Sequence, residues 1–231
     1  YVNFHDGHLE AWPKSTVFGV RPVRTAGVDE PVAILQTGQT TGYRGADGTP
    51  ARGNGDDGDL RLGLTPDFAW ADDGTIDTQV ENIVLDRNTG LAWIRDPSLI
   101  DGRVGADGGV GGAVDLSGPL DWQTALDRCN TLDYAGHDDW RVPNIRELES
   151  VTQVGRADAP MDPVVFPPPA IPPSGSPAVV WWSSTTLGID RPDGPAAHFA
   201  WYFTAAVPVM RHHVAVGFSV PKTRPGLVRC V

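Results

Sequence analysis

The stretch DWQTALDRCNTLDYAGHDDWRVPNIRELESV, residues 121–151, predicts two helices joined by a short link. In the first helix, apolar residues recur with the spacing of one helical face. These residues are Trp122, Ala125, Leu126, Cys129 and Leu132. Asp121 stands where an N-cap is expected, and Gly136 lies where the helix is expected to stop. The first helix is therefore expected to bury one face against the rest of the chain.

The second helix is expected to begin at Asn144, because Pro143 precedes it and Glu147 completes a capping box. Trp140 and Arg141 lie in the link before it. A Trp between two helices is most often a core anchor, and the planar fork of an Arg can hold loop carbonyls or a carboxylate. We therefore interpret this pair as structural and expect the change Arg141→Ala to lower thermal stability.

Short strands surround the two helices in the sequence. Residues 83–86 and 91–95 predict a hairpin whose turn lies at residues 88–90. Later apolar stretches predict antiparallel strands at residues 179–185, 199–204, 214–220 and 227–231. The Gly-rich residues 101–118 and the Pro-rich residues 160–177 predict loops. Two helices segregated from several short strands indicate an α+β fold.

The composition is that of a folded but loop-rich chain. The 231 residues include 27 Gly, 21 Pro and 8 Trp, and 40% are hydrophobic, which is not a disordered composition. The net charge of −11 gives no basic footprint for nucleic acid. Because no apolar run is long enough to cross a bilayer, no membrane span is expected.

The N-terminal residues 1–24 predict a β-hairpin. Since the chain begins with Tyr1, we interpret this position as a processing point or a boundary within a longer precursor. The hairpin and the whole chain both end in a V-R-x-V pattern, at residues 20–23 and 228–231. The N-terminal segment is thus the end of a preceding repeat or a strand pair added to the main sheet. The predicted boundaries are 1–27 for this segment and 28–231 for the main domain, with its core at about 72–231.

Cys129 and Cys230 are the only cysteines and lie about a hundred positions apart. In a loop-rich chain such a pair suits one disulfide better than a catalytic or metal site, and the alternative is two separate buried thiols. A disulfide that closes a loop of this size contributes roughly 4–5 kcal/mol in the chain-entropy model. It would indicate an oxidising compartment, such as the periplasm, the cell surface or the extracellular space.

An acidic loop offers the best candidates for a metal site, because Ca²⁺ is bound by several carboxylate and carbonyl oxygens. The candidate calcium ligands are Asp47, Asp56, Asp57 and Asp59. Their spacing does not match an EF-hand, and the alternative is that they are turn residues beside glycines. The histidines are weaker candidates for zinc, because adjacent strand residues such as His212 and His213 point to opposite faces. The sequence therefore establishes no cofactor, and calcium is the better candidate of the two metals.

The sequence carries no motif that predicts catalysis. It has no G-x-S-x-G, no H-E-x-x-H and no P-loop. We therefore expect that the protein is not an enzyme.

Several motifs carry a family resemblance. They are TGLAW (89–93), W-x-x-A-L-x-x-C (122–129), AGHDDWRVPNIRELESV (135–151), WWSST (181–185) and VRCV (228–231). In combination they resemble the bacterial DUF1566 family, typified by the C-terminal domain of the Legionella collagen-like adhesin. Residues 37–43 and 56–63 resemble an extension that often precedes this domain in secreted bacterial proteins. The structural signature of the resemblance is Trp122, Trp140, Arg141, Pro143 and Glu147.

The resemblance implies a C-type-lectin-like fold, related to the formylglycine-generating enzyme, with two helices packed on short twisted antiparallel strands. It implies a non-catalytic, exported bacterial surface module for adhesion or for binding a glycan or protein. The alternative is a structural subunit of an extracellular filament or envelope complex, which self-associates through its N-terminal strands. The candidate ligand surface consists of the aromatic residues Trp181, Trp182, Trp201 and Tyr202.

Overall fold

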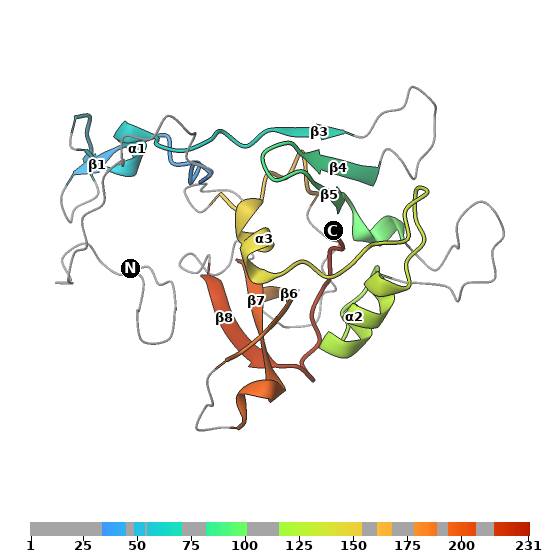
Figure 1. The fold of residues 1–231 in the computed structure, drawn as a ribbon. Helices are drawn as coiled ribbons and strands as arrows, with labels where there is room; N and C mark the ends of the chain where they lie inside the picture. Colours follow the sequence, from blue (N-terminus) through green and yellow to red (C-terminus); the bar gives the residue numbers. More distant parts are fainter. Residues whose placement is uncertain are drawn as a thin grey trace.

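The structure is a computed structural model. It describes residues 34–44, 49–53, 55–70, 82–100, 116–153, 161–167, 178–188, 194–206 and 215–231. Within these ranges the chain is a mixed α/β fold with few helices and small antiparallel sheets (Figure 1). This agrees with the predicted α+β class. The predicted N-terminal hairpin lies outside the described residues.

One sheet contains β3 (Phe68–Trp70), β4 (Ile83–Asp86) and β5 (Leu91–Ile94), paired antiparallel in that order. The turn between β4 and β5 is fixed by the Asp86 carboxylate, which accepts hydrogen bonds from the Asn88 backbone N–H and the Thr89 hydroxyl. Gly90 closes this turn at a φ of 76°, a conformation that favours glycine. The hairpin predicted here is therefore confirmed.

A second sheet contains β6 (Ala178–Thr186), β7 (Phe199–Ala206) and β8 (Ala215–Pro221), again antiparallel in chain order. The residues before β7 form the short 3₁₀ helix η3 (Ala196–His198). Another 3₁₀ helix, η2 (Pro97–Leu99), follows β5. The three strands predicted in this region are confirmed, with bounds that differ by one or two residues.

The last residues of the chain lie inside the fold, and the C-terminus is near the centre of the molecule (Figure 1). Leu227 exchanges backbone hydrogen bonds with β6, from its N–H to the Val180 carbonyl and from the Trp182 N–H to its own carbonyl. Cys230 accepts from the Ile94 N–H, and Val231 pairs in both directions with Arg141. The prediction of a strand at 227–231 is wrong, because this segment changes backbone partners along its length and forms only isolated bridges.

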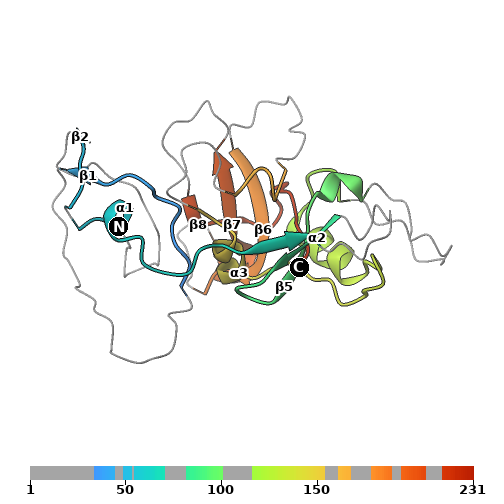
Figure 2. The same cartoon turned by 90° about the horizontal axis from the view of Figure 1, so that it is seen from above.

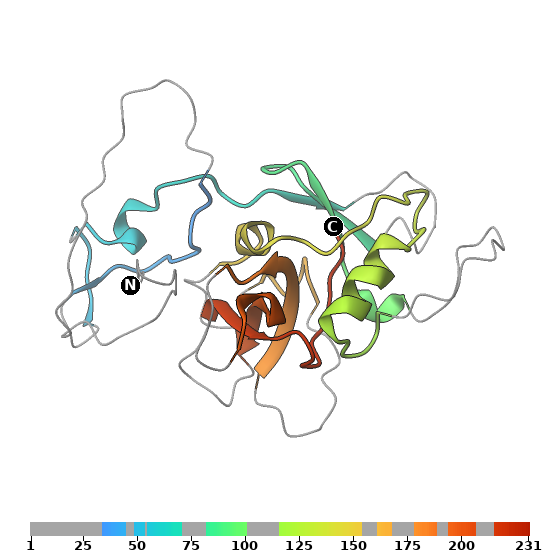
Figure 3. The ribbon, with the colours of Figure 1, turned by 60° about the horizontal axis from the view of Figure 1, so that its bottom comes forward.

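The two predicted helices are α2 (Trp122–Asn130) and α3 (Ile145–Ser150). Asp121 caps α2 through the Thr124 N–H, and Asn144 and Glu147 form the predicted capping box of α3. Helix α3 packs on β6 and β7, and α2 packs on β6 (Figure 3). The prediction that α2 ends at Gly136 is wrong. Gly136 lies at a φ of 76° in a separate turn that follows the helix.

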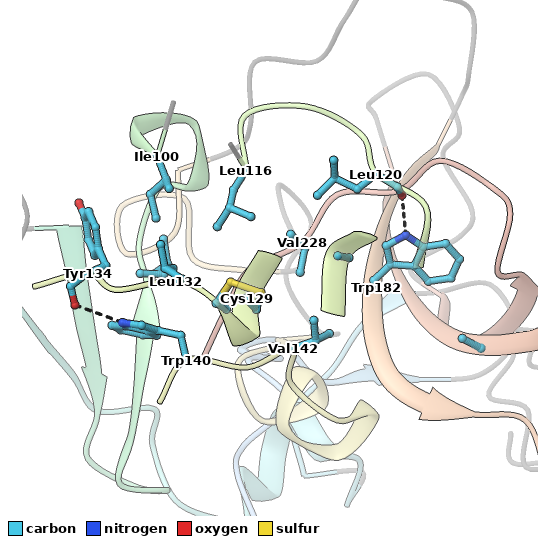
Figure 4. Packing of buried hydrophobic residues seen from close by; sticks show 14 of the residues in the cluster. Ile100, Leu116, Leu120, Cys129, Leu132, Tyr134, Trp140, Val142, Trp182 and Val228 are labelled. Carbon is cyan, nitrogen blue, oxygen red and sulfur yellow. Dashed lines mark hydrogen bonds between the residues drawn. A yellow bond between two sulfur atoms is a disulfide. The ribbon is translucent and has the colours of Figure 1, made fainter. Parts of the chain in front are cut away.

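The core consists of two clusters on opposite sides of β6. The first lies between α2, β5 and β6 (Figure 4) and includes Cys129, Trp140, Trp182 and Cys230. The second includes Trp93, Leu148, Phe166 and Trp181. Adjacent strand residues point to opposite faces, so Trp181 and Trp182 enter different clusters. Strand β6 is therefore buried on both faces.

Residues 34–64 form a small unit beside the two sheets (Figure 2). It contains β1 (Tyr43–Arg44), β2 (Thr49–Pro50) and the single-turn helix α1 (Asp57–Leu60). Its ends are closed by backbone hydrogen bonds from Gln36 to Leu64 and from Leu64 to Ile34. Residues 65–67 then lead into β3, which connects the unit to the first sheet.

Candidate functional site

The predicted ligand surface of aromatic residues is largely part of the core. The side chain of Trp181 is 3% exposed and that of Trp182 is 0% exposed. The indole N–H of Trp182 donates to the Leu120 carbonyl at 2.8 Å (Figure 4). Neither ring can receive a ligand in this fold, so these two predictions are wrong. The strand backbone at Trp201 and Tyr202 is described, but their side chains lie outside the described part.

Trp181 contacts an internal cation, the guanidinium of Arg229. The Arg229 Cζ lies 4.9 Å from the ring centroid of Trp181 and 5.1 Å from that of Phe166. The guanidinium donates to the carbonyl oxygens of Ile94, at 2.7 Å, and Arg95. Burial lowers the pKa of Arg229 to about 9, although the nearby Asp96 acts in the opposite direction. Arg229 thus joins the C-terminal segment, β5 and the loop at Phe166.

The predicted disulfide joins Cys129 on α2 to Cys230 on the C-terminal segment, with a Cα–Cα distance of 5.7 Å (Figure 4). Both cysteines are 0% exposed. The bond therefore fixes the C-terminal segment to the helix that covers one side of the core. It is a structural bond, since no part of it reaches the surface.

The signature residues make structural contacts. The Trp122 indole donates to the Ser183 carbonyl at 2.8 Å, and the Trp140 indole donates to the Tyr134 carbonyl at 3.1 Å. The Pro143 carbonyl accepts the Ser184 N–H at 2.8 Å.

Arg141 forms a two-pronged ion pair with Glu147, at 2.8 and 2.6 Å. The Arg141 hydrogen bond lowers the pKa of Glu147, and the same bond raises the pKa of Arg141. Because Glu147 also caps α3, the pair holds the link to the start of that helix. These contacts position backbone segments.

The acidic loop is organised by hydrogen bonds within the 34–64 unit. Asp56 caps α1 and also accepts the Tyr43 N–H at 2.7 Å. Asp57 accepts from the Thr37 hydroxyl, and Asp59 accepts from the Gly55 N–H at 3.2 Å. Within the described residues, no three His, Cys, Asp or Glu side chains are placed to hold a metal ion.

The described part of the predicted calcium set therefore consists of turn-stabilising carboxylates. Asp47, the remaining member of the set, lies outside the described residues, and calcium binding stays a prediction. The same unit contains a cavity of about 680 Å³, lined by residues that include Thr41, Ala51 and Arg61. Two of the histidines considered for zinc, His212 and His213, also lie outside the described part.

Among the described residues, one exposed tryptophan was not identified by sequence patterns. Trp70, the last residue of β3, is 45% exposed, and the guanidinium Cζ of Arg95 lies 4.3 Å from the centroid of its ring. Arg95 also donates to the carbonyl of Val164, a residue that is 70% exposed. We call Trp70, Arg95 and Val164 the Trp70 patch. A three-residue strand carries no periodic signal, so the available clue was the isolated Trp before an acidic turn.

The comparisons with known proteins concern the second part of the chain. The family of the Lcl C-terminal domain matches residues 82–231. No curated protein and no solved structure matches the chain. Among the described residues, no helix has both the length and the apolar character to cross a membrane. The 34–64 unit, β3 and Trp70 precede the matched region.

Proposed function

The chain belongs to the Lcl C-terminal domain family through residues 82–231, and on this premise we propose that it is a non-catalytic, exported surface module. Its role is adhesion, through the binding of a glycan or a protein on a surface. The family membership is the observation that carries this proposal. We further propose that the fold is C-type-lectin-like, which is supported by two helices on small antiparallel sheets around an internal C-terminal segment.

The disulfide supports export to the cell surface, the periplasm or the extracellular space. Cytosolic thiols are kept reduced, whereas disulfides persist in oxidising compartments. The Cys129–Cys230 bond closes a separation of 101 residues and lies in the centre of a core cluster. A core built around such a bond needs a compartment in which the bond forms.

The groups with shifted pKa values in the described part of the chain belong to helix caps, ion pairs and buried contacts. Each shifted pKa in the described part of the chain has a structural cause. The Thr124 hydroxyl lowers the pKa of the Asp121 cap. Burial lowers the pKa of Lys222, whose amino group lies 3.7 Å from the Trp122 ring centroid. Catalytic sites instead tend to gather shifted groups around one cleft.

An alternative is a structural subunit of an extracellular filament or envelope complex. β3 is an edge strand of its sheet, and edge strands can pair with a neighbouring chain. The proposed assembly segment at residues 1–27 lies outside the described residues. Size-exclusion chromatography with light scattering over a hundredfold range of concentration distinguishes the two. A constant monomer mass favours the binding module, and growing polymers favour the subunit.

The proposed function is tested by binding of the labelled full chain to arrays of surface glycans and surface proteins. We expect saturable binding to at least one class, which is lost after heat unfolding of the same sample. The reduced and alkylated protein serves as a second control, because the fold is expected to depend on the disulfide. Absence of saturable binding on both arrays would overturn the proposal.

A further inference from the structure

Trp70 is the exposed aromatic anchor among the tryptophans that the structure describes. Of the six Trp side chains described, Trp70 is exposed, Trp122 is half-buried and the others are buried in the two core clusters. Burying a large exposed indole against a ligand releases much apolar surface from water. Burial of an exposed Trp against a partner therefore contributes more favourable binding free energy than burial of an exposed aliphatic residue.

The ring of Trp70 is held in place before any ligand arrives. The Arg95 guanidinium lies over one face of the ring, 4.3 Å from its centroid. The Arg95 backbone N–H donates to the Asn82 carbonyl at 2.7 Å, and its side chain donates to the Val164 carbonyl at 3.4 Å. On β3, the Trp70 backbone pairs with Val84. A side chain ordered in this way loses little conformational entropy on binding.

The patch combines an apolar ring with a polar donor. The guanidinium of Arg95 has five N–H groups in a fixed planar fork. Within the described residues, its one hydrogen bond is that to Val164. The guanidinium thus covers the ring face over which it lies, and a ligand can stack only on the opposite face. Arg95 Nε is itself buried and has no acceptor, so it does not contact a ligand.

These features fit a saccharide. A pyranose ring presents axial C–H groups that stack on an indole face, while its equatorial hydroxyls point outward to solvent. A chain linked through equatorial bonds repeats the same flat apolar faces along its length. The net charge of −11 disfavours a polyanionic chain, because the field of the whole protein repels it.

We propose that Trp70 and Arg95 form a stacking site for a neutral, equatorially linked pyranose chain. The assignment rests on the proposed surface-binding function and names the class of ligand for it. One sugar ring stacks on the indole face opposite Arg95, and Arg95 holds the indole in place from its other face. Trp70 precedes the family-matched residues 82–231 and Arg95 lies within them, so the site spans the boundary between the extension and the family domain.

The test is calorimetric titration of the full chain with chitohexaose and with cellohexaose. We expect saturable binding of at least one of these β-1,4-linked sugars. Trp70→Ala should raise Kd at least about tenfold, since truncation of a Trp anchor commonly removes a large part of the binding free energy. Trp70→Phe should retain an intermediate affinity, because a smaller stacking face remains.

The matched control is Leu85→Ala. Leu85 is 41% exposed and lies on the neighbouring strand β4, opposite Ala69, so its side chain is on the other face of the sheet from Trp70. This variant should bind as the wild type does. Indole N–H signals of the wild-type chain provide a second readout, with the Trp70 signal assigned from Trp70→Phe. This signal should shift on titration even if Trp70→Ala proves unstable.

Three outcomes overturn the stacking site. They are equal affinity of a folded Trp70→Ala variant, an unshifted Trp70 indole signal in the presence of bound sugar, and absence of binding of either hexasaccharide. If the chain binds another class of glycan or a protein on the arrays but neither hexasaccharide, the stacking site fails and the surface-binding function stands. If no array ligand and no hexasaccharide binds, both fail.

Discussion

The guanidinium of Arg229 lies 4.9 Å from the ring centroid of Trp181, and both residues are buried. The contact gives a plain reason why Trp181 faces inward, since its ring lies against a cation that the chain itself supplies. The neighbouring Phe166 ring approaches the same guanidinium at 5.1 Å. Aromatic residues of the family motif thus stabilise the scaffold.

The change Arg229→Met should lower the free energy of unfolding by about 2 kcal/mol. It leaves the buried carbonyls of Ile94 and Arg95 without their donor, which costs roughly 1–3 kcal/mol for each unsatisfied group. Relief of the buried charge offsets part of this loss. Chemical denaturation at neutral pH measures the change.

The matched control for this prediction is Arg146→Met, which removes an ion pair whose Arg side chain is 83% exposed. Surface pairs of this kind contribute little, so its effect should stay below about 1 kcal/mol. Equal losses of unfolding free energy in the two variants would show that burial does not make Arg229 more important for stability than an exposed Arg.

Removal of the disulfide by the double change Cys129→Ala and Cys230→Ala should lower stability by roughly 4–5 kcal/mol, as expected for a loop of about a hundred residues. Changing both cysteines avoids a free thiol that could form wrong disulfides. Urea unfolding of the variant, beside the reduced wild type, measures the loss. A double variant whose free energy of unfolding lies within about 1 kcal/mol of that of the oxidised wild type would contradict a stabilising role of the disulfide.

The change Gly226→Ala should destabilise the protein by about 1–3 kcal/mol, which is typical of overpacking a core. A Cβ at this position would lie 2.8 Å from the indole nitrogen of Trp182, which donates to the Leu120 carbonyl. Thermal unfolding monitored by near-ultraviolet circular dichroism follows both the stability and the Trp environment. Gly118→Ala is the control, because a Cβ there meets no atom within 4 Å. A melting temperature of Gly226→Ala equal to that of Gly118→Ala would refute the close contact.

The Arg141–Glu147 pair predicts loss of stability in acid. The hydrogen bond from Arg141 lowers the pKa of Glu147 below its usual value of 4.5. A lowered carboxyl pKa stabilises the fold above the unfolded-state value, and this stabilisation is lost as pH falls through the folded-state value. The free energy of unfolding should therefore fall between about pH 5 and pH 3, and Glu147→Gln should reduce the slope.

The control for the acid dependence is Glu149→Gln. Glu149 pairs only with the exposed Arg146 in the described contacts and takes no part in the capping box. Its slope should resemble that of the wild type. If the free energy of unfolding of Glu147→Gln fell with pH as steeply as that of the wild type, the ion pair would not be a cause of the loss of stability in acid.

Local sequence patterns correctly predicted the structural features that depend on residues close together in the chain. The Asn144–Glu147 capping box and the turn at Gly90 depend on contacts within three or four positions, so their residue types identify them. The disulfide followed from having two cysteines in a chain with no metal pattern. These features could be read without knowing which elements pack together.

The errors came from long-range packing. Trp181 and Trp182 were predicted to belong to a ligand surface because they are aromatic, but β6 is covered on both faces by different core clusters. The segment at 227–231 is β-rich in sequence, yet it lies where several elements meet and pairs with each only briefly. Trp70 was missed because its exposure depends on how β3 joins the sheet, which three residues cannot indicate.

We propose that the chain binds a surface ligand and does not transform it. The most direct measurement incubates the full chain with its strongest array ligand, quantifies the bound fraction, and recovers the ligand for mass spectrometry. We expect saturable, reversible binding and a recovered ligand whose mass is unchanged after prolonged incubation. A ligand converted in proportion to protein and time, or the absence of saturable binding, would contradict it.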